Sequence, residues 1–364
     1  RLERGRILDL APHLEAARRL IRVDIEVNRS QAPAESAAES LASECGEGSE
    51  VPSGEAAGEA SEPRRGDAAE AGRKLLTTSG RSLDYSHPAM RLWTKAKRDG
   101  IWDPFGIDLE RDRADWQRLD AVEREVLLDL TSQFQAGEES VARDLVPLLD
   151  AVASDGSLEE ELFLASFLWE EAKHVELFHR FLDEVVTEPG DLERFHGPAY
   201  RRIFHDELPR SLARLREDAS AVALAEASVT YNMIVEGVLA ETGYHAYHQM
   251  LAANELMPGM RRAIGKLKRD ESRHIAYGVF LLSRLVATHG DDLWQAVDRR
   301  MSSLLPVALE SVREFFERHD RMPFGLELEH FAGFATQQFE RRYARIELAR
   351  RQSLEQILAT GETG

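Results

Sequence analysis

Four long stretches of this sequence combine a helical pattern of apolar residues with one glutamate on the apolar face. Two of these stripes also carry a histidine three residues after the glutamate. The residues concerned are Glu138, Glu171, Glu236 and Glu271, with His174 and His274. Burying an ionised carboxylate costs several kcal/mol even after the protein relaxes. The four glutamates therefore need protons, buried cations or bound metal ions.

Metal ions are the favoured partners because we expect no buried arginine on these faces. One glutamate from each of two helices, with Glu-x-x-His from each of two others, is the ligand pattern of di-metal carboxylate helix bundles. Four carboxylates also balance the charge of two divalent ions. Glu138 and Glu171 are 33 residues apart, and Glu236 and Glu271 are 35 apart, about one helix hairpin in each case.

The Glu-x-x-His spacing is weak by itself, because it occurs five times in this chain. The other three pairs have ordinary explanations: a solvated helix face, a loop and a helix start. These pairs are Glu176/His179, Glu193/His196 and Glu327/His330. Only the pairs that begin at Glu171 and Glu271 lie on apolar stripes.

The pattern is helical almost without interruption from residue 120 onward. Helices are expected over residues 120–151, 158–187, 220–254, 259–289, 292–318 and 326–359, with Gly, Pro and Asp at most of the breaks. No segment shows the two-residue alternation of a β-strand. The sequence therefore predicts an all-α helix bundle.

The first 82 residues have a different composition. Residues 1–30 have the pattern of a short helix, and residues 31–82 are predicted to be a disordered acidic linker with few large apolar side chains. The folded domain is then expected over residues 83–364.

Net charge and cysteine content limit the partners and the compartment. The chain carries a formal charge of −19, which argues against nucleic acid or anionic membranes as main partners. It has one cysteine, Cys45, so neither a disulfide framework nor a thiolate metal site is expected. A cytoplasmic protein without a membrane span is predicted.

Four motifs around the glutamates resemble the ligand-binding oxidases of the ribonucleotide reductase small-subunit superfamily. They read QAGEE at 135–139, EEAKH at 170–174, YNMIVEG at 231–237 and RDESRH at 269–274. The resemblance spans residues 83–349 and implies a ferritin-like four-helix core with additional helices. It also implies a homodimer and an oxidase that uses dioxygen, with a mixed manganese–iron pair and a bound long-chain fatty acid or other hydrophobic small molecule.

Individual roles follow from the same resemblance. Manganese is expected at Glu138, Glu171 and His174, and iron at Glu171, Glu236, Glu271 and His274. An ether link is expected between Val141 and Tyr231. Asp270 is expected to orient His174, and Trp102 to end an electron relay, although plain packing also explains that tryptophan. Tyr244 and Tyr247 are expected in the core or cavity wall. Carboxylate and imidazole suit iron and manganese alike, so a di-iron centre stays open.

Two other classes fit the ligand set. A manganese–iron ribonucleotide reductase small subunit is the first, and Phe178 at the radical-tyrosine position is compatible with it. The absence of an aromatic residue after Tyr343 and the Val141/Tyr231 pair favour the oxidase instead. A non-enzymatic metal-binding helix bundle is the second alternative.

Overall fold

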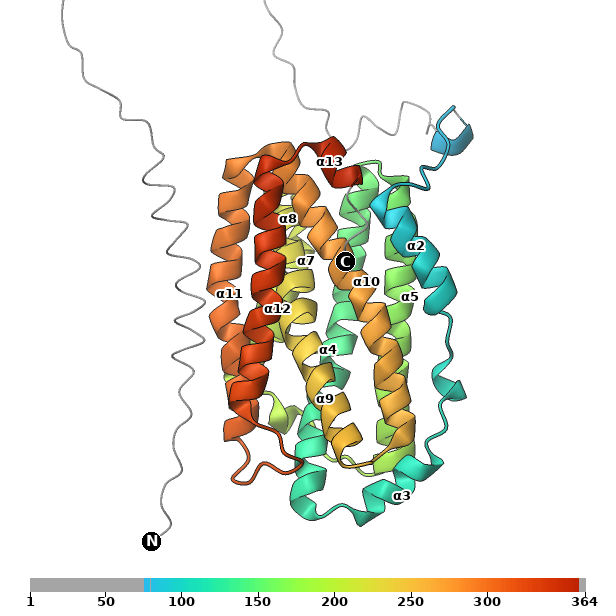
Figure 1. Ribbon diagram of the computed structural model, residues 1–364, viewed down its shortest axis with the longest axis vertical. Coiled ribbons are helices and arrows are strands. Elements are labelled where there is room, and N and C mark those ends of the chain that lie inside the picture. Colours follow the sequence, from blue (N-terminus) through green and yellow to red (C-terminus); the bar gives the residue numbers. More distant parts are fainter. Residues whose placement is uncertain (1–74, 79, 360–364) are drawn as a thin grey trace, which may run out of the picture. The chain divides into compact units, whose positions relative to one another are not determined.

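The structure, a computed structural model, describes residues 75–78 and 80–359, and all regular elements within them are helices (Figure 1). The long elements are α4 (Ala121–Ser154), α5 (Leu158–Phe181), α8 (Ala221–Ser228), η7 (Val229–Ala240), α9 (Glu241–Ala253), α10 (Pro258–His289), α11 (Asp291–Glu317) and α12 (Leu328–Leu348). Each predicted helical stretch is found with its ends moved by a few residues, except that the stretch 326–359 is divided into α12, a single turn at Ala349–Arg351 and a short helix at Leu354–Ala359. The predicted all-α fold is confirmed.

The core is a ferritin-like bundle of α4, α5, the continuous run α8–η7–α9, and α10. α4 packs along α5, and α10 packs along both η7 and α5. Local sequence features stabilise the first turns of these helices. Asp120 and Glu123 form a capping box at the start of α4, and Pro258 is the first residue of α10. α10 ends before Gly290, whose φ of 74° suits glycine.

Additional helices surround this core. α11 and α12 pack on η7, and α2 (Pro88–Asp99) packs on α5 and α10 (Figure 1). The remaining short elements are η2 (Leu76–Thr78), η3 (Pro104–Gly106), α3 (Glu110–Arg118), η4 (Leu182–Val186), η5 (Glu193–Phe195), α6 (Pro198–Arg201), η6 (Arg202–Glu207), α7 (Leu208–Arg214), η8 (Ala349–Arg351) and α13 (Leu354–Ala359). Most were not predicted, because they are too short to show a clear periodicity.

The middle of the third core helix is π-helical, which the sequence pattern did not indicate. η7 replaces the expected α-helix over twelve residues, and Glu236 lies inside it. Wide turns of this kind often occur at functional sites. Gly278 of α10 allows η7 to approach, since a Cβ at this position would lie 2.2 Å from the Cβ of Asn232. The Asn232 amide in turn donates to Glu236 at 2.9 Å.

The run Ala221–Ala253 is also long and apolar enough, by composition, to cross a membrane. However, 83% of its most apolar window is buried inside the bundle, as expected for the core helix of a folded domain. The predictions for residues 1–30 and for most of the linker at 31–82 lie outside the described residues. Within that linker the structure describes the single turn η2 and residues 80–82.

Candidate metal centre

The four glutamates and two histidines singled out in the sequence come together inside the bundle. One group contains Glu138, Glu171, His174 and Glu271, and a second contains Glu171, Glu236, Glu271 and His274. Within each group one ligand atom per residue lies within 4.8 Å of the others, and all six residues are buried. Glu171 and Glu271 belong to both groups. The arrangement has the form of two adjacent metal positions with shared carboxylates.

The inward-facing atoms of this cluster lack hydrogen-bond partners. Both oxygens of Glu171 and the Nδ1 atoms of His174 and His274 are buried without one, and so is one oxygen each of Glu236 and Glu271. Buried polar atoms are normally satisfied, so a group of orphaned oxygen and nitrogen atoms fits a bound cation. This donor set, carboxylate oxygen with imidazole nitrogen, suits first-row metals such as iron and manganese.

The pKa shifts of the buried glutamates also indicate a site for a cation. Burial raises the pKa of Glu138 and of Glu236 well above the usual value, because a charged carboxylate is poorly solvated there. Burial would also raise the pKa of Glu171, but the imidazoles of His174 and His274 lower it to about 2. Glu138 and Glu236 thus lie where a charged carboxylate needs a bound cation in place of water.

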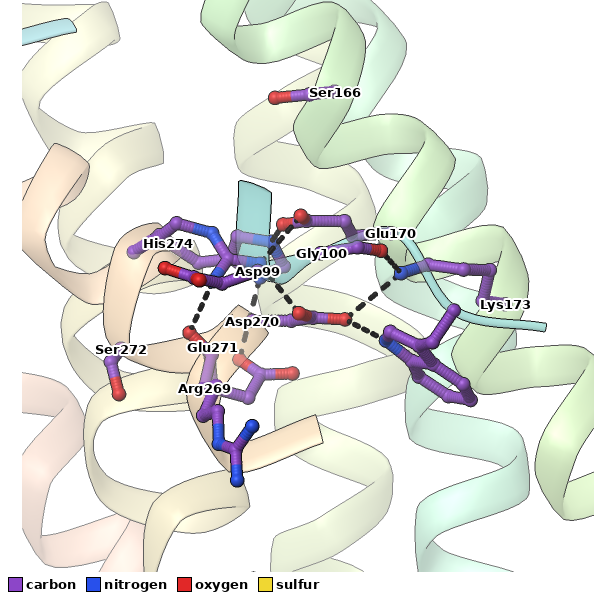
Figure 2. Close-up of polar contacts among 12 residues, drawn as sticks. Asp99, Gly100, Ser166, Glu170, Lys173, Arg269, Asp270, Glu271, Ser272 and His274 are labelled. Atoms are coloured by element: carbon purple, nitrogen blue, oxygen red, sulfur yellow. Dashed lines mark hydrogen bonds and ion pairs between the residues drawn. The ribbon is translucent and has the colours of Figure 1, made fainter. Parts of the chain in front are cut away.

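Each histidine is oriented by an acidic residue from the opposite helix. His174 Nε2 lies 3.3 Å from Asp270 Oδ2, and His274 Nε2 lies 2.9 Å from Glu170 Oε2. The two contacts cross, because each acid directly precedes the glutamate of the other Glu-x-x-His motif. Figure 2 shows Glu170 and Asp270 close together, with Lys173 beside Asp270. Such partners fix the direction of the imidazole and tune its basicity. Glu170 was missed in the sequence, although an acid before the glutamate occurs in both motifs.

No buried arginine was expected on the ligand-bearing faces, and the structure places two buried cations directly beside those faces. Lys173 and Arg273 are buried one residue before each histidine. Lys173 donates to Asp270 at 3.1 Å, and Arg273 donates to both Glu170 and Asp270. These two cations pair with the two outer acids and not with the four inner glutamates. The balance of four carboxylates against two divalent ions is therefore unchanged.

Trp102 belongs to the same network. Its indole Nε1 donates to Asp270 Oδ2 at 2.8 Å, and its ring stacks near that of His174 with centroids 6.3 Å apart. Trp102 is thus connected to a candidate metal ligand through a single carboxylate. This placement is compatible with the expected relay.

The expected cross-link pair also lies at the site. The phenol oxygen of Tyr231 is 3.4 Å from the backbone oxygen of Val141, and both residues are buried. Burial raises the pKa of Tyr231 well above its usual value, so the phenol keeps its proton. Tyr244 has a more direct role than the sequence suggested, since its hydroxyl donates to Glu138. Tyr247 bonds Thr131 at 3.1 Å, away from the cluster.

An apolar cavity reaches the cluster from one side. Its lining includes the four glutamates and Val141. Its outer wall includes Val312, Phe315 and Phe331 of α11 and α12. A cavity with apolar walls and one strongly polar end fits an elongated hydrophobic molecule with a polar head.

Glu170→Gln is predicted to weaken metal binding about 10–100-fold, because this carboxylate orients His274 without being a ligand. The matched control is Glu176→Gln, an exposed position on the same helix. Competition titration with a metal-binding dye measures both affinities. Equal affinities in the two variants would show that the Glu170 contact does not support the site.

Comparison with known proteins agrees with this geometry. The family model described as ribonucleotide reductase, small chain, matches residues 83–349. The chain belongs to this family of di-metal carboxylate helix bundles. Solved structures that are similar to this chain include R2-like ligand-binding oxidases. One is a valine-to-leucine variant with an anaerobically reconstituted Mn/Fe cofactor, at 35% identity and TM-score 0.71 over 75% of this chain and 98% of that one.

A second solved structure is an alanine-to-phenylalanine variant of an R2-like ligand-binding oxidase, also with a Mn/Fe cofactor. It is 35% identical, covers 75% of this chain and 98% of its own, and has a TM-score of 0.72. Family and site together make this chain an oxidoreductase with a di-metal carboxylate site, as the sequence resemblance implied.

Proposed function

We propose that the chain is a manganese–iron oxidase that uses dioxygen, binds a long-chain fatty acid beside the metals and forms an ether link between Val141 and Tyr231. The observation that carries this proposal is the pair of buried ligand groups that share Glu171 and Glu271 at the end of an apolar cavity. When bound, the metal pair supplies dioxygen binding and two-electron oxidation of an unactivated C–H bond.

The residues of the chain have separate tasks in this proposal. Glu138, Glu171 and His174 hold one metal, and Glu171, Glu236, Glu271 and His274 hold the other. Asp270 and Glu170 keep the imidazoles aimed inward, and Lys173 and Arg273 neutralise these two acids. The apolar walls exclude water, so the oxidising power is directed at a bound carbon chain or at Val141.

The ether link requires one C–H and one O–H bond to break. The Val141 side chain loses one hydrogen from carbon, the Tyr231 phenol loses its proton, and a C–O bond forms. Two electrons and two protons leave the chain, and dioxygen accepts the electrons. The phenol oxygen is well placed for this step, because it already lies beside the Val141 backbone in a dry core.

The proposed ligand is a fatty acid because of the form of the cavity. Its carboxylate would lie at the metal end of the cavity, where the bound metal ions balance the charge of the glutamates. Its hydrocarbon chain would lie along the phenylalanines of the outer wall. The homodimer and the cytoplasmic location implied by the resemblance stay predictions.

Elemental analysis with native mass spectrometry tests the assignment. We expect about one manganese, one iron and one long-chain acid per chain after aerobic reconstitution with both metals. Two irons with no manganese would contradict the metal assignment, and organic extracts without a stoichiometric acid would contradict the ligand.

A pair of variants makes the ligand test specific. Val312→Trp fills the cavity and is expected to reduce the bound acid to almost none. Val307→Trp, on the same helix but outside the cavity lining, is expected to leave it unchanged.

A further inference from the structure

Lys173 lies against a second tryptophan besides Trp102. Its Nζ atom is 4.5 Å from the ring centroid of Trp102 and 4.3 Å from that of Trp169. The two indole centroids are therefore at most about 9 Å apart, with the ammonium touching both. The two rings differ in their access to solvent.

Trp169 is at the surface and Trp102 is not. Trp169 is 44% exposed, whereas Trp102 is only 7% exposed and Lys173 is buried. An unbroken series of contacts thus leads from solvent to a candidate metal ligand: Trp169, Lys173, Trp102, Asp270 and His174. A route that ended at Trp102 would stop below the surface.

We propose that Trp169 is the surface end of the electron-entry route, where an acidic one-electron donor protein docks and passes electrons past Lys173 to Trp102. The inference rests on the proposed oxidase function, in which dioxygen removes electrons from the site that must be replaced. The donor is taken to be a separate protein because the series of contacts ends at the exposed Trp169.

The step moves one electron at a time and leaves no net change in the tryptophans. An oxidised Trp102 takes one electron from the Trp169 indole, and the docked donor returns one electron to Trp169. Asp270, which accepts the indole N–H of Trp102, stabilises the positive charge while it lies on that ring. The docked donor protein is therefore the species that is oxidised.

The charge of the two helices that pack on α5 indicates the kind of donor. The helix α2 and the first part of α10, residues 258–269, together hold nine basic side chains and one acidic one, although the whole chain carries −19. The acidic one, Asp99, is already paired with Arg98 at 2.6 Å. Both helices adjoin α5, which carries Trp169. Lys266 of this basic region lies 5.8 Å from the Trp102 ring.

This local positive region selects an acidic partner. Complementary charge favours the encounter of an acidic donor with this basic face. Exposed Ile101, which directly precedes Trp102, offers an apolar contact area. A partner with acidic residues around an exposed redox group therefore fits.

The test is anaerobic reduction of the reconstituted protein by a reduced plant-type [2Fe–2S] ferredoxin, followed by stopped-flow absorbance. Trp169→Leu is expected to slow reduction by about tenfold or more, whereas Trp169→Tyr keeps most of the rate because tyrosine can also be oxidised. Trp93→Leu is the matched control, since Trp93 is a partly exposed indole with Lys97 at 5.2 Å. The rate is expected to fall with salt.

A second readout needs no metal. Carbodiimide joins carboxylates of the ferredoxin to nearby lysines, and peptide mapping of the metal-free protein is expected to find Lys97 and Lys266. The proposal would be overturned by cross-links confined to other faces, or by equal reduction rates in all Trp169 variants. It would also be overturned if Trp93→Leu slowed reduction as much as Trp169→Leu, or if a short RNA bound in place of the ferredoxin. A wild-type protein that binds no metal would instead overturn the oxidase function, while the cross-linking result would still stand.

Discussion

Replacing Glu171 by alanine is expected to leave the chain with almost no bound metal, where the intact protein holds two ions. Glu171 belongs to both ligand groups, and neither of its oxygens has another partner. Its removal takes one ligand from each position and one negative charge from the cluster. The loss of metal affinity is expected to exceed the roughly 10–100-fold effect of Glu170→Gln, which changes a side chain that orients a ligand without binding the metal.

Elemental analysis after reconstitution measures this effect. Glu176→Ala is the control, because Glu176 lies on the same helix and is exposed. Glu171→Gln preserves side-chain volume, so it separates loss of the ligand from loss of packing, and circular dichroism verifies that each variant is folded. Two metals per chain in Glu171→Ala would refute the ligand assignment.

Aerobic reconstitution is expected to lower the intact mass of the wild-type chain by two hydrogens, and the Tyr231→Phe variant is expected to show no such loss. Phenylalanine has no oxygen with which to form the ether, whereas the ring that packs against Phe167 is kept. The effect is all-or-none per molecule. Intact-mass measurement and peptide mapping follow it directly.

Two controls accompany this measurement. Tyr247→Phe removes a hydroxyl that is equally buried but bonded to Thr131, so its mass loss is expected to equal that of the wild type. Anaerobic reconstitution with the same metals is expected to give no loss, because the electrons have no acceptor. Separate Val141 and Tyr231 peptides in the aerobic wild type would exclude the link.

The long helices and the inner ligand set were readable from the sequence for one physical reason. A charged residue on an apolar stripe is costly, so the stripes that contain Glu138, Glu171, Glu236 and Glu271 pointed to a shared interior site. Helical periodicity was enough to place each residue on its face. Spacing of about one hairpin was enough to bring the helices together.

The residues that surround the ligands could not be predicted from the sequence in the same way. Glu170, Lys173 and Arg273 lie on helix positions adjacent to the ligands and are buried only because α5 and α10 cross at that point. Periodicity within one helix does not show which neighbouring helix covers such a position. The π-helical turns of η7 were hidden for a related reason, since they depend on the close approach of α10 at Gly278.

The choice between oxidase and reductase also needed more than the ligand set. Phe178 stacks near Phe134, with centroids 5.2 Å apart, in the apolar layer beside the cluster. The likeness to R2-like ligand-binding oxidases, at 35% identity, is the finding that separates these two classes here.

The spread of the ligands along the chain has a consequence for biosynthesis. The first ligand is at residue 138 and the last at residue 274, so a growing polypeptide emerging from the ribosome presents only the first Glu-x-x-His pair until α10 has been made. The position held by Glu138, Glu171 and His174 can form once α4 and α5 have folded, whereas the second position needs Glu271 and His274 of the last core helix. Binding of the second ion therefore follows the docking of α10, and the proposed ether link can form only after that step.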